Sequence, residues 1–230
     1  MAFFDHYSSG QATPLGRELV KKAAQLLCSS VKKVHPAAAS VLEIGPGKGE
    51  FCELWLQQGG TVTALEANPI LGEALSTLNV RVVKAVAPPL PFDSGEFDVA
   101  IAAHVIEHMP TVTQAIELVE EMARVVRPGG IVGIVAPDVR SWRFDFWNAD
   151  YTHNYVTSPR RLEQLFFNSG LQVEEMLLYS GYLPGLAGRV LRFLAPLLPG
   201  SPEAGGLWLQ RLYKLRMTFL GNFLIIGRKA

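Results

Sequence analysis

The chain has 230 residues and a formal net charge of zero, with 21 basic residues balancing 21 acidic ones, so its charge gives no support for nucleic acid as a partner. Residues 1–10 lack a basic region followed by an apolar core, and no apolar run reaches about 18 residues, so neither a signal peptide nor a spanning helix is expected. Two cysteines without metal-site spacing favour a cytoplasmic protein, and the length favours a single domain over residues 1–230.

Helices and strands alternate through the first part of the chain. Thr13-Pro14, a capping residue followed by proline, predicts a helix over residues 14–33. A helix over 112–126 is expected to end in a turn over 127–130, because that stretch contains a proline and two glycines. Short apolar runs predict buried strands over 40–44, 61–65, 80–83, 97–102 and 131–135. Strands alternating with helices imply a parallel sheet covered on both faces.

The pattern changes after residue 138. Ser158 predicts the N-cap of a helix over 159–168, which is followed by a strand over 171–179 and a last strand over 218–227. Between these two strands, residues 182–217 carry two apolar helical patterns. Five basic residues are interleaved with the leucines of that region: Arg189, Arg192, Arg211, Lys214 and Arg216.

A glycine turn stands at the centre of the first part. Residues 41–68 read as a strand, a turn with Gly45, Gly47 and Gly49, a helix, and a second strand that ends on Glu66. The glycines let the main chain approach a ligand closely, and the helix start offers free N–H groups. A carboxylate at the end of the second strand can accept both hydroxyls of a ribose. The stretch therefore predicts a nucleotide-binding unit.

The spacing of the turn separates it from two common alternatives. It reads G-x-G-x-G, whereas the dinucleotide fingerprint reads G-x-G-x-x-G, and Glu50 stands where the third glycine of that fingerprint would be. No Gly-Lys-Ser/Thr follows at P-loop spacing. The run Glu43-Ile44-Gly45-Pro46-Gly47-Lys48-Gly49 instead resembles motif I of the class I S-adenosylmethionine-dependent methyltransferases.

The resemblance continues along residues 5–180. Glu66-Ala67-Asn68-Pro69 resembles the second motif of this family, in which the acid binds the ribose. Residues 85–92 are similar to the adenine segment, although residues 85–88 lack the carboxylate that many members have, so main-chain groups would recognise the adenine. Residues 97–108 resemble the fourth motif, beside the methionine part of the cofactor. Residues 13–17, with Tyr7, resemble a leading segment that closes over the cofactor in some bacterial members.

The resemblance implies a Rossmann-like α/β fold with a mostly parallel seven-stranded sheet, helices on both faces and an antiparallel last strand. It also implies S-adenosyl-L-methionine as the cofactor and methyl transfer to a small-molecule acceptor. The cofactor-binding residues that it implies are Tyr7, Arg17, Glu43, Gly45, Pro46, Gly47, Gly49, Glu66, Ala67, Asn68, Ala85, Val86, Ala87, Ala102 and His104. For Arg17, a surface position on the first helix is the alternative.

The single domain then divides into parts with different expected roles. Residues 40–138 form the cofactor-binding core after the first helix, and residues 139–181 are a substrate-side segment. Residues 182–217 are a helical insertion, and residues 218–230 hold the last strand. The basic amphipathic patterns of the insertion fit a lid over a hydrophobic acceptor, peripheral contact with an anionic membrane, a dimer face, or ordinary packing on the sheet.

Methyl transfer needs a general base only where the acceptor has a high pKa. His104, His153 and Asp138 are the candidates, because all three are expected near the carboxyl ends of the strands, where ligands bind in open α/β folds. Capping and loop roles are the alternatives for each. Glu107-His108 is interpreted as the start of a helix and not as a metal pair, because no third ligand is evident, and no metal is expected.

Aromatic residues before residue 158 could cover an apolar acceptor or simply pack in the core. They are Tyr7, Phe144, Phe146, Trp147, Tyr151 and Tyr155. Two other functions stay open on the sequence alone, a nucleotide-binding oxidoreductase on a similar sheet and a non-catalytic cofactor-binding module. The acceptor atom and the oligomeric state cannot be predicted.

Overall fold

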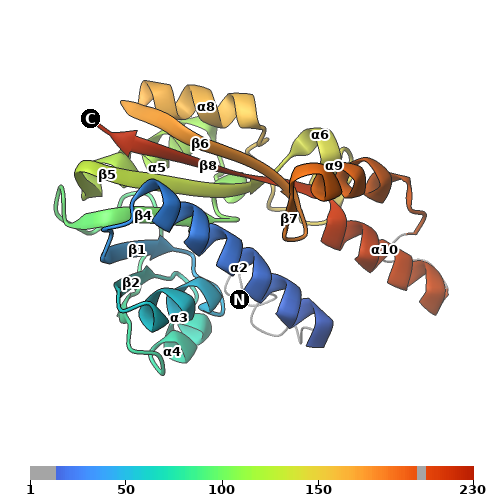
Figure 1. The fold of residues 1–230 in the computed structure, drawn as a ribbon, viewed down its shortest axis with the longest axis horizontal. Coiled ribbons are helices and arrows are strands. Elements are labelled where there is room, and N and C mark those ends of the chain that lie inside the picture. The colour runs from blue at the N-terminus through green and yellow to red at the C-terminus, as the bar shows by residue number, and fades with distance from the viewer. Residues whose placement is uncertain (1–13, 201–205) are drawn as a thin grey trace.

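A computed structural model describes residues 14–200 and 206–230 (Figure 1). Tyr7 and Thr13 lie outside these residues, so the predictions that concern them are not tested by the structure. Among the described residues, no helix is long and apolar enough to cross a membrane.

Eight strands form one sheet in the order β3-β2-β1-β4-β5-β8-β6-β7. The first five run parallel, whereas β8 is antiparallel to both of its neighbours, β5 and β6. The strands are β1 Ser40–Ile44, β2 Thr61–Leu65, β3 Arg81–Val83, β4 Phe97–Ala103, β5 Val126–Pro137, β6 Leu171–Ser180, β7 Leu183–Pro184 and β8 Gly221–Lys229. The expected fold class and the antiparallel last strand are confirmed, with one strand more than the seven predicted: β7, a two-residue hairpin partner of β6.

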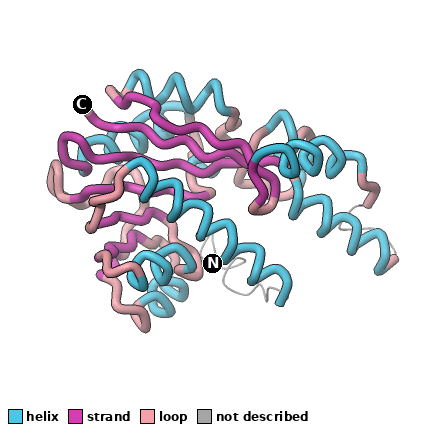
Figure 2. The backbone as a smooth tube through the Cα atoms, in the orientation of Figure 1, coloured by secondary structure: helices cyan, strands magenta, loops and turns pink. Residues whose placement is uncertain are grey.

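Helices cover both faces of this sheet (Figure 2). One hydrophobic cluster contains residues of α2, α3 and α4, and a second contains residues of α5 and α8. The helices are α2 Pro14–Val34, α3 Glu50–Gln57, α4 Pro69–Leu75, α5 Val112–Val125, α6 Val139–Trp142, α7 Asp145–Asn148, α8 Pro159–Asn168, α9 Gly185–Leu194 and α10 Leu207–Phe219, with short 3-10 turns η1 Ile106–His108 and η2 Ala195–Leu197.

The junction between α5 and β5 differs from its prediction as a turn. Strand β5 begins at Val126, directly after α5, and its pairing with β4 shifts register between Phe97 and Val99. Residues 127–130 are therefore an irregular part of the strand. Arg127 pairs there with Asp98 at 2.6 Å, and a side chain on Gly130 would lie 2.8 Å from the Asp98 carbonyl oxygen. This long-range contact, absent from any local pattern, keeps the segment in the sheet.

The start of the last strand was predicted too early. Thr218 belongs to α10, where its hydroxyl donates to the Lys214 carbonyl at 2.8 Å, and β8 begins at Gly221. Threonine is common in strands because its side chain is β-branched, but here the main-chain hydrogen bonds of α10 extend the helix through Thr218. Together with α6 and α9, α10 lies at the far end of the sheet from the C-terminus (Figure 1).

Candidate functional site

The glycine turn begins where β1 ends. The Gly45 amide donates to the Leu65 carbonyl at 2.9 Å, so the turn is tied to the end of β2. Gly45 has φ +62°, and a Cβ there would lie 2.8 Å from Val105 Cγ2. Gly47 has φ +58°, and no atom lies within 4 Å of the position that its Cβ would take. The turn thus packs tightly against Val105, just after β4, at Gly45 and has open space on the Cβ side of Gly47.

We expect Gly45→Ala to destabilise the protein more than Gly47→Ala. Both substitutions place a side chain in the left-handed region, which costs about 1–2 kcal/mol, but only Gly45→Ala also pushes into Val105, adding roughly 1–3 kcal/mol. Urea unfolding of the two variants without ligand measures the difference. Equal losses would contradict the close approach between the turn and Val105.

Two polar side chains at the end of β2 lie against this turn. Glu66 is 6% exposed, and its Oε1 accepts from the Asn68 amide at 2.8 Å. Burial raises the pKa of Glu66, and backbone N–H groups of Asn68, Gly47 and Ala67 partly oppose that rise. Asn68 caps α4 by accepting from Ile70 N, and its buried Nδ2 has no hydrogen-bond partner among the residues described. A carboxylate and a spare amide donor therefore lie beside the glycine turn.

The acid of the first strand, Glu43, is buried beneath the turn. The Cys52 thiol donates to Glu43 Oε2 at 2.9 Å. Burial raises the pKa of Glu43 to about 7, and the bond from Cys52 opposes part of the rise. Burial also raises the pKa of the Cys28 thiol to about 12 and raises the pKa of the Cys52 thiol, so both cysteines are inert buried thiols.

Glu43 gives the folding stability a pH dependence. Its folded pKa of about 7 lies above its ordinary value of 4.5, so the folded state holds the proton more tightly. Its contribution is fully present below pH 4.5 and is lost as the pH rises through about 7, with a total change of about 3 kcal/mol. Glu43→Gln should remove this part of the slope. Urea unfolding between pH 5 and about 8 tests it, and parallel profiles for both proteins would contradict it.

Three histidines and an acid meet just past the end of β4. His104 has φ 56° and is half-exposed, and its Nδ1 lies 3.1 Å from Glu107 Oε1. Glu107 is buried, and His108 follows it in η1. His153 comes from the segment after α7, and its ring centroid lies 4.9 Å from that of His108. The structure thus gathers two of the candidate bases, His104 and His153, around Glu107 and His108.

The third candidate base has other partners. Asp138 is 2% exposed and caps α6 by accepting from the Arg140 amide. Both of its carboxylate oxygens also accept from the Arg140 guanidinium, each at 2.9 Å. A carboxylate held by a cap and a two-point ion pair is poorly placed to take a proton, so the capping role predicted as the alternative fits Asp138 better.

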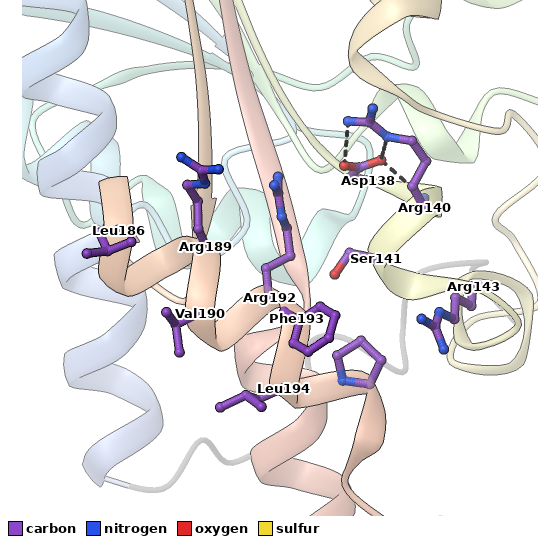
Figure 3. A pocket seen from close by; sticks show the side chains of 11 residues that line it. Asp138, Arg140, Ser141, Arg143, Leu186, Arg189, Val190, Arg192, Phe193 and Leu194 are labelled. Atoms are coloured by element: carbon purple, nitrogen blue, oxygen red, sulfur yellow. Dashed lines mark hydrogen bonds and ion pairs between the residues drawn. The ribbon is translucent and has the colours of Figure 1, made fainter.

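A cavity of about 680 Å³ lies beside Asp138, between α6 and α9 (Figure 3). It does not include the glycine turn. Arg189 and Arg192 extend from α9 in the same direction, and Ser141 and Arg143 come from the segment of α6. The cavity therefore combines basic groups with the apolar side chains of α9. Sequence patterns predict a helix in the region of α9 but do not indicate that this helix faces α6.

The aromatic set divides into two groups. Phe146 and Tyr155 are buried core residues, whereas Phe144, Trp147 and Tyr151 are exposed. Other predicted cofactor residues differ in exposure. Ala102 is buried at the end of β4, whereas Ala85 and Ala87 are partly buried against the core and Val86 is exposed. Arg17 is exposed in the first turn of α2.

The strand order, the glycine turn after β1 and the acid after β2 define a class I methyltransferase. Residues 17–176 match the family described as methyltransferase domain, which is more than half of the chain. The chain belongs to this family, so the predicted methyltransferase family is confirmed. The match does not support an oxidoreductase or a non-catalytic module.

Individual proteins are more distant. An uncharacterised methyltransferase of Mycobacterium sp. (strain KMS) is 33% identical over 107 residues, which are 46% of this chain and 41% of that protein. The chain thus matches less than half the length of this relative. A ubiquinone biosynthesis O-methyltransferase of Saccharophagus degradans is 27% identical over 164 residues, 63% of this chain and 68% of that protein. The structure of a SAM-dependent methyltransferase from Archaeoglobus fulgidus shares the fold, with a TM-score of 0.66, 19% identity and coverage of 99% and 98% of the two chains.

Proposed function

We propose that this chain transfers a methyl group from S-adenosyl-L-methionine to a small acceptor with an apolar or lipid-linked body. Membership of the family supports the reaction. The proposed location of the cofactor site is supported by the hydrogen bond between Glu66 and the Gly47 backbone of the glycine turn. When bound, the cofactor supplies a methyl group already activated on a sulfonium, so the protein contributes position and electrostatic field.

The residues around the turn fit the cofactor chemically. Glu66 would accept the ribose hydroxyls, and the spare Nδ2 donor of Asn68 suits a polar ligand atom. The open main chain at Gly47 lets a ligand approach without a side chain between them. The full set proposed to hold the cofactor comprises Tyr7, Arg17, Glu43, Gly45, Pro46, Gly47, Gly49, Glu66, Ala67, Asn68, Ala85, Val86, Ala87, Ala102 and His104.

The acceptor side is proposed at the end of the sheet that carries α9 and α10. Apolar side chains are well exposed there: Leu186 at 75%, Phe193 at 73% and Trp208 at 67%. Not one described residue of α10 is buried. Exposed apolar side chains next to a basic cavity favour an acceptor with an apolar body and a polar or anionic part. His104 remains the candidate base, since its side chain is accessible and Asp138 is bound to Arg140.

Isothermal calorimetry with S-adenosylhomocysteine, with NAD as the comparison, tests the cofactor. We expect saturable binding of the homocysteine nucleoside at one site per chain and no heat with NAD. Transfer of a labelled methyl group from the cofactor into a lipid extract, followed by mass spectrometry, then tests the reaction. Absence of binding to S-adenosylhomocysteine, or binding without transfer to any extract or small-molecule fraction, would overturn the proposal.

The same surface supports a peripheral membrane location for a cytoplasmic protein. Arg189, Arg211 and Lys214 are exposed among the apolar residues of α9 and α10, a combination that binds anionic bilayers. Each basic residue near such a surface contributes about 1 kcal/mol, so Arg189→Glu/Arg211→Glu should weaken co-sedimentation with phosphatidylserine vesicles by at least about tenfold.

The matched control for that experiment is Arg160→Glu, which changes an exposed arginine of α8. Its binding to the vesicles should equal that of the unchanged protein. Negligible binding by all three proteins would remove the membrane location. Equal, strong binding by all three would place the contact elsewhere on the molecule.

A further inference from the structure

Glu107, His108 and His153 form a compact group of potential metal ligands. One ligand atom from each lies within 4.8 Å of the others. Two of these residues are adjacent in η1, and the third arrives from a distant part of the chain, after α7. The local sequence around Glu107-His108 offers no third ligand, but folding brings His153 to the site.

Hydrogen bonds at Nδ1 fix which nitrogen of each ring can coordinate. Thr152 donates its hydroxyl hydrogen to Asp150 at 2.7 Å, so at 2.6 Å it accepts from Nδ1–H of His108. His153 Nδ1–H donates to the Phe146 carbonyl at 2.6 Å, since a carbonyl can only accept. In the neutral form of each ring, Nε2 then carries the lone pair. Outer partners of this kind orient histidines that bind metals.

One oxygen of the buried acid in this group lacks a hydrogen-bond donor. Glu107 is 1% exposed, and its Oε2 has no hydrogen-bond partner in residues 14–200 and 206–230. A buried carboxylate oxygen without a donor is costly unless something positive occupies the space beside it.

We propose that Glu107, His108 and His153 bind one divalent transition-metal ion through the carboxylate and the two Nε2 atoms. Two imidazoles and a carboxylate suit zinc, iron, cobalt or manganese better than magnesium or calcium, which prefer oxygen ligands. His104, 3.1 Å from Glu107 Oε1, orients the carboxylate. Three protein ligands leave at least one coordination position open.

The site has a consequence that depends on the proposed function. The group follows β4 and so lies at the carboxyl ends of the parallel strands, where ligands bind in open α/β folds. An open coordination position there can accept an oxygen of the methyl acceptor and lower the pKa of its hydroxyl. The acceptor would then be an oxygen nucleophile such as a phenol or an alcohol. Metal binding itself does not depend on this step.

The test uses the full chain, stripped with a chelator and titrated with Zn²⁺ and Co²⁺. We expect one ion per chain, a loss of affinity of at least about a hundredfold for His153→Gln and Glu107→Gln, and no change for His35→Gln, which removes a histidine elsewhere in the fold. The Co²⁺ absorption spectrum should lack thiolate charge transfer, because Cys28 and Cys52 are not ligands. Circular dichroism checks that the variants are folded.

Two results would overturn the proposal: no stoichiometric ion in the unchanged protein, or equal affinity in His153→Gln and His35→Gln. Titration of the same samples with S-adenosylhomocysteine keeps the two proposals apart. If the protein binds the nucleoside but no metal ion, only the metal-site proposal fails. Binding of metal without the nucleoside would remove the cofactor assignment and the role in acceptor binding, but not the metal site.

Discussion

Replacing Glu66 by alanine is expected to weaken the binding of S-adenosylhomocysteine by at least about a hundredfold. A hydrogen bond to a charged group is worth about 1.5–3 kcal/mol, and a carboxylate that accepts two ribose hydroxyls makes two of them. Losing both corresponds to roughly two or more orders of magnitude in the dissociation constant. The Glu66 side chain is buried and held by the Asn68 amide, so little ordering is needed when the ligand binds. Isothermal calorimetry at one fixed pH measures the change.

Two further variants separate charge from shape at this position. Glu66→Gln keeps the size of the side chain and one acceptor oxygen, and it should fall between the alanine variant and the unchanged protein. Glu73→Ala removes an exposed acid from α4, the helix that follows, and should bind normally. Unaltered affinity in Glu66→Ala would show that the ribose lies elsewhere, and the nucleotide site proposed at the glycine turn would have to be abandoned.

The core of the fold could be predicted because its signals are local. Strands β1, β2 and β4 are short apolar runs, and α5 begins at Val112, directly after Thr111, whose hydroxyl caps the helix by accepting from Gln114 N. Gly45 and Gly47 have left-handed backbone angles, which glycine adopts without steric cost. Each of these features is caused by a few consecutive residues, so a local sequence pattern is enough to predict it.

Features that depend on distant contacts could not be predicted. The irregular start of β5 depends on Asp98, which holds Arg127 from the neighbouring strand. The group of Glu107, His108 and His153 depends on the loop after α7 returning to η1. A pair such as Glu107-His108 supplies two of the three ligands, but no local signal indicates which of the other four histidines completes the set.

The basic residues of the insertion looked alike in the sequence and have different environments in the fold. Arg189, Arg211 and Lys214 are exposed. Arg192 packs so closely on β8 that a side chain on Gly221 would lie 2.3 Å from its Cδ. Arg216 forms an ion pair with Asp145 of α7. Only the exposed residues are available to an anionic surface, which is why the membrane experiment changes Arg189 and Arg211 and leaves Arg192 intact.

The ion pair of Arg216 and Asp145 is expected to hold α10 against the fold. The Asp145 side chain is 7% exposed and that of Arg216 is 21% exposed, so solvent screens the pair only weakly. Removing Asp145 leaves the partly buried Arg216 guanidinium without its partner, and we expect Asp145→Ala to lower the free energy of unfolding by about 1–3 kcal/mol. Urea unfolding measures the loss. A loss within about 0.5 kcal/mol, which is usual for a surface substitution, would contradict the anchor.

The double variant Asp145→Ala/Arg216→Met distinguishes an uncompensated charge from lost packing. Methionine keeps an unbranched apolar side chain but removes the charge, so the double variant should be more stable than Asp145→Ala alone. If the double variant instead loses the sum of the two single effects, packing and not charge anchors the helix. Since no described residue of α10 is buried, little apolar contact is available to replace the pair. Loss of the pair should therefore release α10 and increase the mobility of the apolar surface proposed for the acceptor.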